Sequence, residues 1–273
     1  DYGVAIVDFN EGSTVSYPQG HTAKEFFLAK PVQETDALIN LCKMKTHALE
    51  RVTGGVKNLY GCISGLHKAK GHTKYTNADI FARQLIDLNQ LIKPRFCVMD
   101  GIVAMDGNGP TSGDPVKMKV LLLGNDPVAI DSVYCHLVHL DPQMVPTNVH
   151  GETMGLGTWR EENIRLLTDG GEITMQEAVE RFGNPDFNVD RKKQRGNLWN
   201  RFNNGFLRYF QKKPYIEEDK CKKCGICVEA CPVEGKALQF KNGRRKPPVY
   251  NYHKCIRCFC CQEMCPHKAI QVK

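Results

Sequence analysis

The sequence predicts an α/β domain with a largely parallel sheet, followed by a small cysteine-rich α+β module. Two observations lead to this prediction. Strand-like apolar runs alternate with helical patterns along most of the chain, and two similar cysteine runs lie near the C-terminus. The 273 residues are enough for two compact units. We therefore expect an α/β domain at 1–190, a basic aromatic linker helix at 191–215 and a second domain at 216–273.

The first predicted strands are short apolar runs. Residues 4–7 read as a buried strand close to Asp1, which indicates that sequence is missing upstream: either the protein is processed or truncated, or this is the remaining part of a larger domain. Residues 25–29 and 37–42 are two further runs of strand length. These runs supply the first strands of the predicted sheet.

Helical patterns alternate with the later strands. Between Asn77 and Leu91, apolar residues recur at helical spacing. Residues 127–140 begin with a proline, which is well tolerated in a first helical turn, and carry another apolar stripe. Strand-like runs at 96–99, 120–123 and 164–167 complete the α/β pattern.

The two cysteine runs carry the clearest chemical signal. Each reads C-x2-C-x2-C-x3-C-P, a spacing that binds a 4Fe-4S cluster. Three thiolates at intervals of three residues converge from one tight loop, and in a two-cluster arrangement the fourth ligand comes from the other run. Zinc sites and disulfides are the alternatives, but zinc sites usually pair two C-x2-C hairpins or include histidine. The runs therefore predict a ferredoxin-like domain with two 4Fe-4S clusters.

This crossed pattern assigns four cysteines to each cluster. One cluster takes Cys221, Cys224, Cys227 and Cys265. The other takes Cys255, Cys258, Cys261 and Cys231. Cys260 lies outside the register and is expected to be a free thiol. The cysteines without ligand spacing are expected to be small buried hydrophobes, with Cys62 left open because it lies in a glycine-rich region; they are Cys42, Cys62, Cys97 and Cys135.

The charge of the chain indicates its partners. The net charge is +7, and the cysteine module is basic. A cationic surface suits docking of an acidic electron carrier such as ferredoxin or flavodoxin. No nucleic-acid recognition motif accompanies the charge, so nucleic acid is not expected as a partner. For residues 191–213 we prefer a connecting helix packed between the domains, and the alternative is a helix that binds a membrane surface or a partner.

Cysteine usage and hydropathy predict the location. Thiolates reserved for clusters need a reducing interior, which indicates a cytoplasmic protein from an organism that lives with little oxygen. No apolar run is long enough to span a bilayer, so no transmembrane segment is expected.

A second group of chemically active residues follows the predicted strand at 37–42. Its cations, glycines and amide are Lys43, Lys45, His47, Gly54, Gly55, Lys57 and Asn58, with His67, Lys68 and His72 further on. Glycine pairs let backbone N–H groups approach an anion, and nearby cations complete a carboxylate or phosphate site. At the carboxyl end of a parallel strand, they predict a crevice for an anionic small-molecule substrate. The alternative is a glycine-rich surface turn with solvated lysines.

A glycine-rich loop after the strand at 96–99 is a second candidate lining of this crevice. Its predicted ligand-binding residues are Asn108, Gly109 and Thr111, with an ordinary surface loop as the equal alternative. Asp126 and Asp131 lie at the start of the helix at 127–140, where capping and helix-dipole electrostatics are the preferred interpretation.

These motifs together resemble a known family. The segments at 41–47, 53–58, 100–102 and 105–111, joined to the twin cysteine runs, are similar to the family called "domain of unknown function 362" linked to a ferredoxin module. This resemblance implies an iron–sulfur protein, and the family name assigns no reaction.

A weaker resemblance implies a more specific chemistry. The order of His47, Gly54, Gly55, Lys57 and His72 looks like a segment of nickel-pincer lactate racemases. Carried over by position, Lys57 would attach the organic cofactor, His72 would be a metal ligand and His47 an acid–base residue. Those racemases lack a ferredoxin module, so a shared scaffold is the preferred interpretation.

Two functions of different class therefore follow from the sequence. The first is an iron–sulfur oxidoreductase whose clusters pass electrons to a substrate or to an additional organic or metal cofactor in the α/β domain. The catalytic candidates are His47, Lys57 and His72. The second is a non-catalytic electron-transfer subunit whose α/β domain is a docking platform. A nickel-pincer racemase-like enzyme is the third and least favoured alternative.

Overall fold

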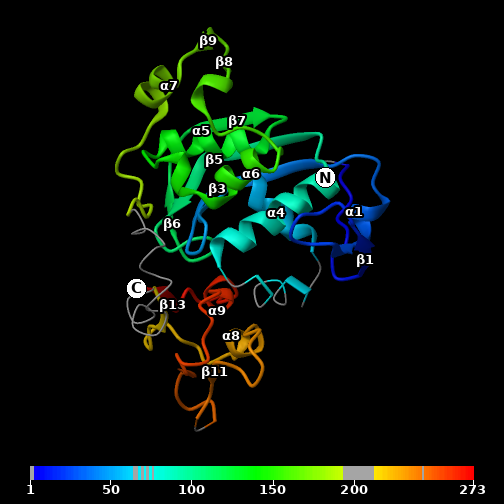
Figure 1. Cartoon of the computed structure of the whole chain (residues 1–273). Helices are drawn as coiled ribbons and strands as arrows, with labels where there is room; N and C mark the ends of the chain where they lie inside the picture. The colour runs from blue at the N-terminus through cyan, green and yellow to red at the C-terminus, as the bar shows by residue number, and fades with distance from the viewer. Residues whose placement is uncertain are drawn as a thin grey trace, which may run out of the picture.

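The structure is a computed structural model that describes residues 3–63, 67–68, 71, 74–75, 77–192, 212–241 and 243–273. Most of the linker helix predicted at 191–215 lies outside these residues, and so does His72. The described part of the chain forms an α/β unit and a smaller C-terminal module, which lies below it in Figure 1. The predicted α/β class with a small α+β module is confirmed.

A mixed sheet lies at the centre of the α/β unit. Its strands are β3 (Ile39–His47), β4 (Arg51–Thr53), β5 (Phe96–Asp106), β6 (Asp114–Val116) and β7 (Val120–Gly124). The order is β4-β3-β5-β6, and β7 also pairs with β5. Among the described strands of this sheet, only β3 and β5 run parallel. The sheet is therefore mixed, where the sequence predicted a largely parallel one.

The connections explain these strand directions. Between β3 and β5 the chain passes through α2 (Gly55–Asn58), η1 (Leu59–Cys62) and α4 (Ala78–Ile92), which form the helical crossover that a parallel pair needs. No helix separates β5 from β6 and β7, so the chain turns back on β5 and both strands pair antiparallel. The apolar runs alone do not contain this directional information.

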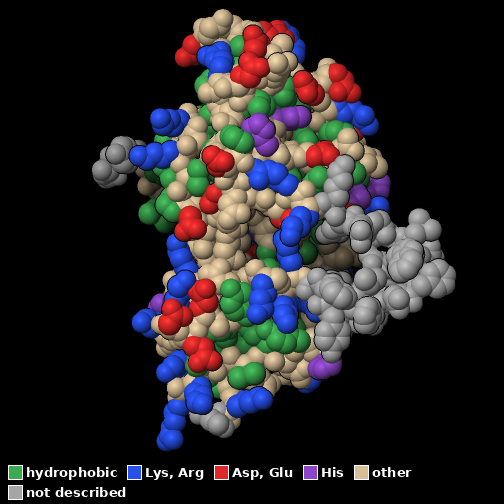
Figure 2. All heavy atoms as spheres, turned by 90° about the vertical axis from the view of Figure 1, so that its left-hand side faces the viewer, with side chains coloured by type: hydrophobic (Ala, Val, Ile, Leu, Met, Phe, Trp, Pro, Cys, Tyr) green, Lys and Arg blue, Asp and Glu red, His purple; other side chains and the backbone are tan. Residues whose placement is uncertain are grey.

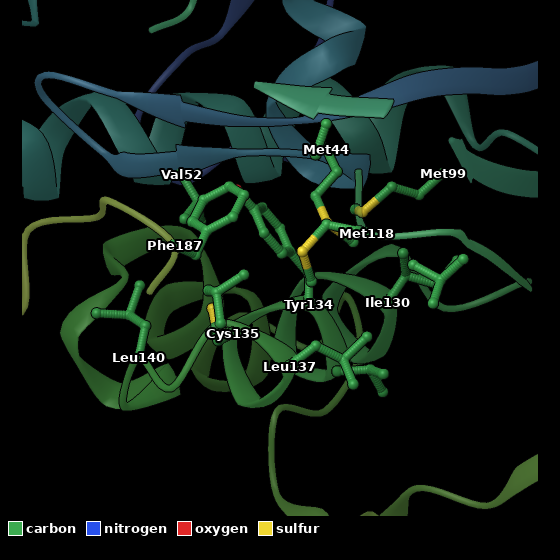
Figure 3. Close-up of a cluster of buried hydrophobic side chains, with 14 of the residues drawn as sticks. Met44, Val52, Met99, Met118, Ile130, Tyr134, Cys135, Leu137, Leu140 and Phe187 are labelled. Carbon is green, nitrogen blue, oxygen red and sulfur yellow. The ribbon is translucent and has the colours of Figure 1, made fainter. Parts of the chain in front are cut away.

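The main core lies between the sheet and α5 (Pro127–Leu137). Met44 and Met99 project from β3 and β5 onto Ile130 and Tyr134 of α5 (Figure 3). α5 is capped by Asp126, whose carboxylate accepts hydrogen bonds from the backbone N–H groups of Val128 and Ala129. The predicted capping role of Asp126 is confirmed.

A second core joins α4 to the N-terminal hairpin. The hairpin strands are β1 (Gly12–Ser16) and β2 (Glu25–Ala29), followed by α1 (Lys30–Glu34). Phe26 and Leu28 pack with Phe81 and Leu85 of α4, which confirms the apolar stripe predicted for this helix. The strand predicted at 4–7 is absent from the described structure: Ile6 is fully exposed, because no neighbouring segment covers this run.

The rest of the α/β unit extends beyond α5. It contains η2 (Pro142–Met144), α6 (Pro146–Thr153), η3 (Glu161–Asn163), β8 (Leu166–Thr168), β9 (Gly171–Ile173) and α7 (Met175–Phe182). β8 overlaps the strand predicted at 164–167 and pairs with β9, outside the central sheet.

The C-terminal module is built from two short helices and two strand pairs. β10 (Pro214–Ile216) pairs with β13 (Ile270–Val272), and the hairpin of β11 (Leu238–Gln239) and β12 (Val249–Tyr250) lies between the two cysteine runs. α8 (Ile226–Glu229) follows the first cysteine loop and α9 (Cys260–Glu263) follows the second. In Figure 1, α9 is the helix of the module beside the α/β unit.

Arg51 anchors the end of the α/β unit. Its guanidinium donates to the backbone oxygens of Met144, Asp190 and Lys192. The Asp190 carboxylate pairs with Lys212, two residues before the module begins at Pro214. The module therefore starts beside the point where the α/β unit ends.

A glycine substitution tests the packing below the sheet. A Cβ atom at Gly54 would meet the Asp131 carboxylate and the Met99 methyl group. We expect Gly54→Ala to lower the free energy of unfolding by about 1–3 kcal/mol, the usual cost of overpacking. At Gly61, a Cβ atom has no neighbour within 4 Å, so Gly61→Ala is the matched control. Chemical denaturation of both variants measures the difference, and equal stabilities would contradict the assigned contact.

Candidate functional site

Four cysteines line one hollow of the C-terminal module. They are Cys221, Cys224, Cys227 and Cys265, which we call the α8 set. Lys222, Lys223 and His267 line the same hollow. The structure thus gathers the first three cysteines of one run and the last of the other, the combination that the sequence assigned to one cluster.

The other four candidate ligands also lie near one another, and we call them the α9 set: Cys255, Cys258, Cys261 and Cys231. Cys231 and Cys255 pack together in one buried cluster with Ala237. Cys261, Cys255 and Cys231 are buried, whereas in the α8 set only Cys227 is. The α9 set is therefore the more enclosed of the two.

The two cysteine loops share one backbone conformation. Lys223 and Gly225 have φ of 57° and 91°, and Arg257 and Phe259, at the matching positions of the second run, have 58° and 61°. Left-handed residues between successive cysteines turn the loop, so that thiols three residues apart face a common point. This geometry is one that a group ligated by several thiolates needs.

The thiols of the α8 set influence the ionisation of one another. Burial and the neighbouring thiols Cys265, Cys221 and Cys224 raise the pKa of Cys227 to about 12. Four thiolates would repel one another unless cations lay between them, and iron supplies that positive charge in a 4Fe-4S cluster. In the part of the chain that the structure describes, no three His, Cys, Asp or Glu side chains lie close enough to hold a single metal ion.

Backbone and side-chain donors point at the cysteine sulfurs. The Ala237 N–H donates to Cys231 Sγ at 3.3 Å, and the Ala269 N–H donates to Cys265 Sγ at 3.4 Å. Tyr250 Oη donates to Cys261 Sγ at 3.1 Å. Hydrogen bonds of this kind tune the potential of an iron–sulfur cluster.

Helix α9 joins this module to the α/β unit. The Glu263 carboxylate accepts a hydrogen bond from His47 Nε2 at 2.7 Å. Gln262 Nε2 donates to the backbone oxygens of Asn108 and Gly109, at 2.8 and 3.1 Å. The helix that follows the second cysteine loop is thus bonded directly to β3 and to the glycine-rich loop after β5.

The predicted ligand-binding residues of the glycine-rich loop take part in this docking. Asn108 Nδ2 donates to the Ile270 oxygen, and Thr111 Oγ1 donates to the Glu263 oxygen at 3.0 Å. Gly109 packs so closely on Thr46 that a side chain would collide with its backbone oxygen. Asn108, Gly109 and Thr111 therefore bind the C-terminal module in this structure, where the sequence placed them in a substrate crevice.

His47 has partners on both ring nitrogens. Nδ1 accepts hydrogen bonds from the N–H groups of Leu49 and Glu50, so the proton is on Nε2 and is donated to Glu263. Burial and the nearby Lys57 ammonium lower the pKa of His47, which keeps the ring neutral at pH 7. The ring links the two units here, which differs from the predicted acid–base role.

The Gly54–Gly55 turn binds an anion of the protein itself. The Asp131 carboxylate accepts hydrogen bonds from the N–H groups of Gly55, at 2.5 Å, and Val56, at 3.1 Å. The glycine pair does bring backbone donors to an anion, as its sequence indicated, but the anion is an internal side chain. Asp131 therefore caps α2, where the sequence placed it as a residue of its own helix start.

Two further residues of the predicted crevice, Lys43 and Asn58, bind neighbouring groups of the protein itself. The Lys43 ammonium pairs with the Asp100 carboxylate on the neighbouring strand, which holds the pKa of Asp100 below its ordinary value. Asn58 Nδ2 donates to Asn40 Oδ1 and to the Leu41 backbone oxygen. β3 extends to His47, so Lys43 and Lys45 lie on the strand itself and not beyond its end.

Three lysines, Lys45, Lys57 and Lys68, make no ion pair with a carboxylate among the described residues. The buried Glu50 carboxyl lies close enough to Lys57 for the two charges to interact. Lys57 is buried, with 8% exposure, on α2. Burial and the charge of Lys57 lower the pKa values of Lys45 and Lys68, so these ammonium groups act on one another. The charges of Glu263 and Cys260 on α9 also influence the pKa of Lys68. The cationic part of the predicted crevice thus lies beside the helix of the α9 set.

Several contributors to this region carry no sequence signal. Glu263 and Gln262 fall between two predicted cluster cysteines, and nothing in their spacing predicts contact with β3. Glu50 is fully buried, and neither of its carboxylate oxygens has a hydrogen-bond partner in the described structure. Cys42 and Cys97 are buried as predicted, with their sulfurs 3.9 Å apart.

Comparisons with known proteins agree with this two-part architecture. Residues 213–266 match the family model described as a 4Fe-4S dicluster domain, which supports iron–sulfur electron transfer as the chemistry of the module. Residues 1–136 match the model described as domain of unknown function (DUF362). The chain thus combines a DUF362 domain with a 4Fe-4S ferredoxin domain, as its motifs indicated.

A curated relative shares part of this chain. A thylakoid-associated protein of Synechocystis sp. is 36% identical over 173 residues, which are 63% of this chain and 53% of the relative. The chain thus matches about half the length of that relative. No solved structure matches the chain significantly. No helix in the described ranges is long and apolar enough to cross a membrane.

Cysteine substitutions test the crossed assignment. We expect Cys231→Ala to lower the iron content of anaerobically purified protein from about eight to about four atoms per chain, through loss of the cluster at the α9 set. Cys260→Ala is the control and is expected to keep the full iron content. Iron analysis and EPR spectroscopy measure both. Selective loss of the cluster at the α8 set in Cys231→Ala would overturn the assignment.

The buried Glu50 predicts a pH dependence of stability. Burial raises the pKa of Glu50 to about 8, above its ordinary value of 4.5. Between these values the folded protein holds a proton that the unfolded chain releases, so stability falls as pH rises, by at most about 1.4 kcal/mol per pH unit. We expect Glu50→Gln to flatten this dependence. Thermal unfolding at pH 5, 6.5 and 8 measures it, and parallel curves for the two proteins would refute the prediction.

Proposed function

We propose that this protein carries electrons through two 4Fe-4S clusters to a small anionic ligand in the α/β unit, as an iron–sulfur oxidoreductase. The hydrogen bond between Glu263 of α9 and His47 of β3 is the observation that carries this proposal. It joins the segment of the second cysteine run to the strand that also carries Lys45. Electrons on the α9 set would then lie beside the cationic region of the α/β unit.

The proposed route begins at the more exposed cysteines. Cys221, Cys224 and Cys265 are partly exposed, and Lys222 and Lys223 line the same hollow. Figure 2 shows further Lys and Arg side chains over the lower part of the molecule, which is this module. An acidic carrier such as ferredoxin or flavodoxin would dock there, because opposite charges raise the rate of association.

The proposed destination is the group of Lys45, Lys57 and Lys68. Lysines act as point charges toward carboxylates and phosphates, and a buried ammonium without a carboxylate partner is stabilised by a bound anion. Lys57 is the most buried of the three. The ligand would therefore be a small anion held mainly by Lys57 of α2.

A non-catalytic electron-transfer subunit is the second candidate. The donors of Asn108, Thr111 and His47 are engaged with the module, and the Gly55 amide is engaged with Asp131. These bonds favour a docking platform over a substrate site built from the same residues. Of the nickel-pincer residues, His47 is engaged and His72 is outside the described structure, so we derive no step through such a cofactor.

The proposal also includes a cellular location. Exposed cluster cysteines would need a reducing compartment, which supports a cytoplasmic location. The relative from Synechocystis is thylakoid-associated by its name, and a membrane-surface location of this chain is the alternative.

Native mass spectrometry of anaerobically purified protein tests the ligand. We expect the wild-type chain to carry a small anionic ligand and Lys57→Ala to weaken its binding by about tenfold or more, as expected for loss of a charged hydrogen-bond donor. Lys43→Ala is the matched control, because Lys43 already pairs with Asp100. Equal occupancy in Lys57→Ala and wild type would reject the site. A ligand-free wild-type protein that still passes electrons to a partner would support the docking platform.

A further inference from the structure

The two cysteine sets are related by an internal repeat. Each has the same left-handed residues in its loop, and each receives one backbone hydrogen bond at its fourth cysteine: Ala237 to Cys231 and Ala269 to Cys265. By these features alone, clusters at the two sets would have similar surroundings. Any difference between their potentials must then come from features outside the repeat.

Burial is the first such difference. In the α9 set, Cys231, Cys255 and Cys261 are 7–8% exposed, whereas Cys227 is the one buried member of the α8 set. Adding an electron to a cluster adds negative charge, which is less stable where water is excluded. Burial would therefore make a cluster at the α9 set the harder one to reduce, and electrons would remain at the α8 set.

A tyrosine hydroxyl is the second difference, and its effect on the potential of a cluster at the α9 set is opposite to that of burial. Tyr250 Oη donates to Cys261 Sγ at 3.1 Å. No hydroxyl group in the described part of the chain donates to Cys227, the matching cysteine of the first run. A hydrogen bond to a ligand sulfur stabilises the extra negative charge of the reduced cluster and so raises its potential.

The module holds this tyrosine in place. Tyr250 lies on β12, paired with Leu238 of β11, and its ring stacks on Tyr252 with centroids 5.4 Å apart. Tyr252 is held in turn by its hydroxyl, which donates to the Pro214 oxygen at 2.8 Å. The β11–β12 hairpin between the two cysteine runs thus positions one hydroxyl against one cysteine of the α9 set.

We propose that Tyr250 is a positioning residue that raises the potential of the cluster at the α9 set enough for the cluster at the α8 set to reduce it. This inference rests on the proposed electron route and sets its direction, from the exposed α8 set to the enclosed α9 set beside His47. With clusters bound at both sets, one electron would pass from a reduced cluster at the α8 set to an oxidised cluster at the α9 set. No bond is broken, and the Tyr250 proton stays on its oxygen.

The test is an EPR-monitored redox titration of the anaerobic holoprotein. Cys224→Ser and Cys258→Ser, each of which alters one set, assign the two signals. We expect Tyr250→Phe to shift the midpoint potential of the α9-set cluster to more negative values and to leave the α8-set cluster unchanged. Tyr252→Phe is the matched control: it keeps the ring that stacks on Tyr250 and removes a hydroxyl that is bonded to Pro214 and not to a cysteine sulfur, so both potentials are expected to stay close to wild type.

A second variant covers the case in which Tyr250→Phe fails to load iron. Site-specific replacement of Tyr250 by 3-fluorotyrosine makes the hydroxyl a stronger donor and is expected to shift the α9-set potential to more positive values. Unchanged potentials in iron-loaded Tyr250→Phe, or a shift at the α8 set, would overturn the inference. The titration needs no substrate. If Tyr250→Phe shifts the α9-set potential as expected but the protein carries no bound anion, the proposed function is rejected and the role of Tyr250 stands.

Discussion

The hydrogen bond between His47 and Glu263 is the interaction on which the arrangement of the two units depends. His47 is buried, and two backbone amides occupy Nδ1, so its Nε2 proton needs an acceptor. Glu263 of the module supplies that acceptor. An unsatisfied polar group in such a place costs about 1–3 kcal/mol, which makes this bond a specific reason for the module to dock in one orientation. The contacts of Gln262 and Thr111 follow from that orientation.

The same docking brings charged groups of the α/β unit close to the second cysteine run. Helix α9 contains Cys261 and ends at Glu263, so a cluster at the α9 set and the buried imidazole belong to one continuous structure. Lys57 lies close enough to influence His47 and Lys68, and Lys68 senses α9. An anion held there would lie between positive side chains and a negatively charged cluster.

The predicted anion-binding residues show why composition overstates a ligand site. Glycine amides and lysines are what an external anion needs, but a folded chain also has anions of its own. Asp131 takes the amides of Gly55 and Val56, and Asp100 takes Lys43. Local sequence contains no information on whether the partner is a ligand or an aspartate about 75 residues away, because that depends on which helix packs beneath the turn. Lys45 and Lys57 are predicted cations that make no ion pair in the described structure, and the carboxyl group that interacts with Lys57 is the buried Glu50.

The sequence by itself determined the features that depend on neighbours in the chain. Cysteine spacing defined the two loops, apolar periodicity defined α4, and Asp126 before Pro127 defined a helix start. These predictions are correct because cysteine-loop spacing, helical periodicity and helix capping each depend on residues only a few positions apart. Only the tertiary structure decided that β7 runs antiparallel to β5, that the glycine-rich loop binds α9 and that Tyr250 reaches Cys261. Those outcomes depend on contacts between segments that meet only after folding, where burial decides which donors and charges are already satisfied.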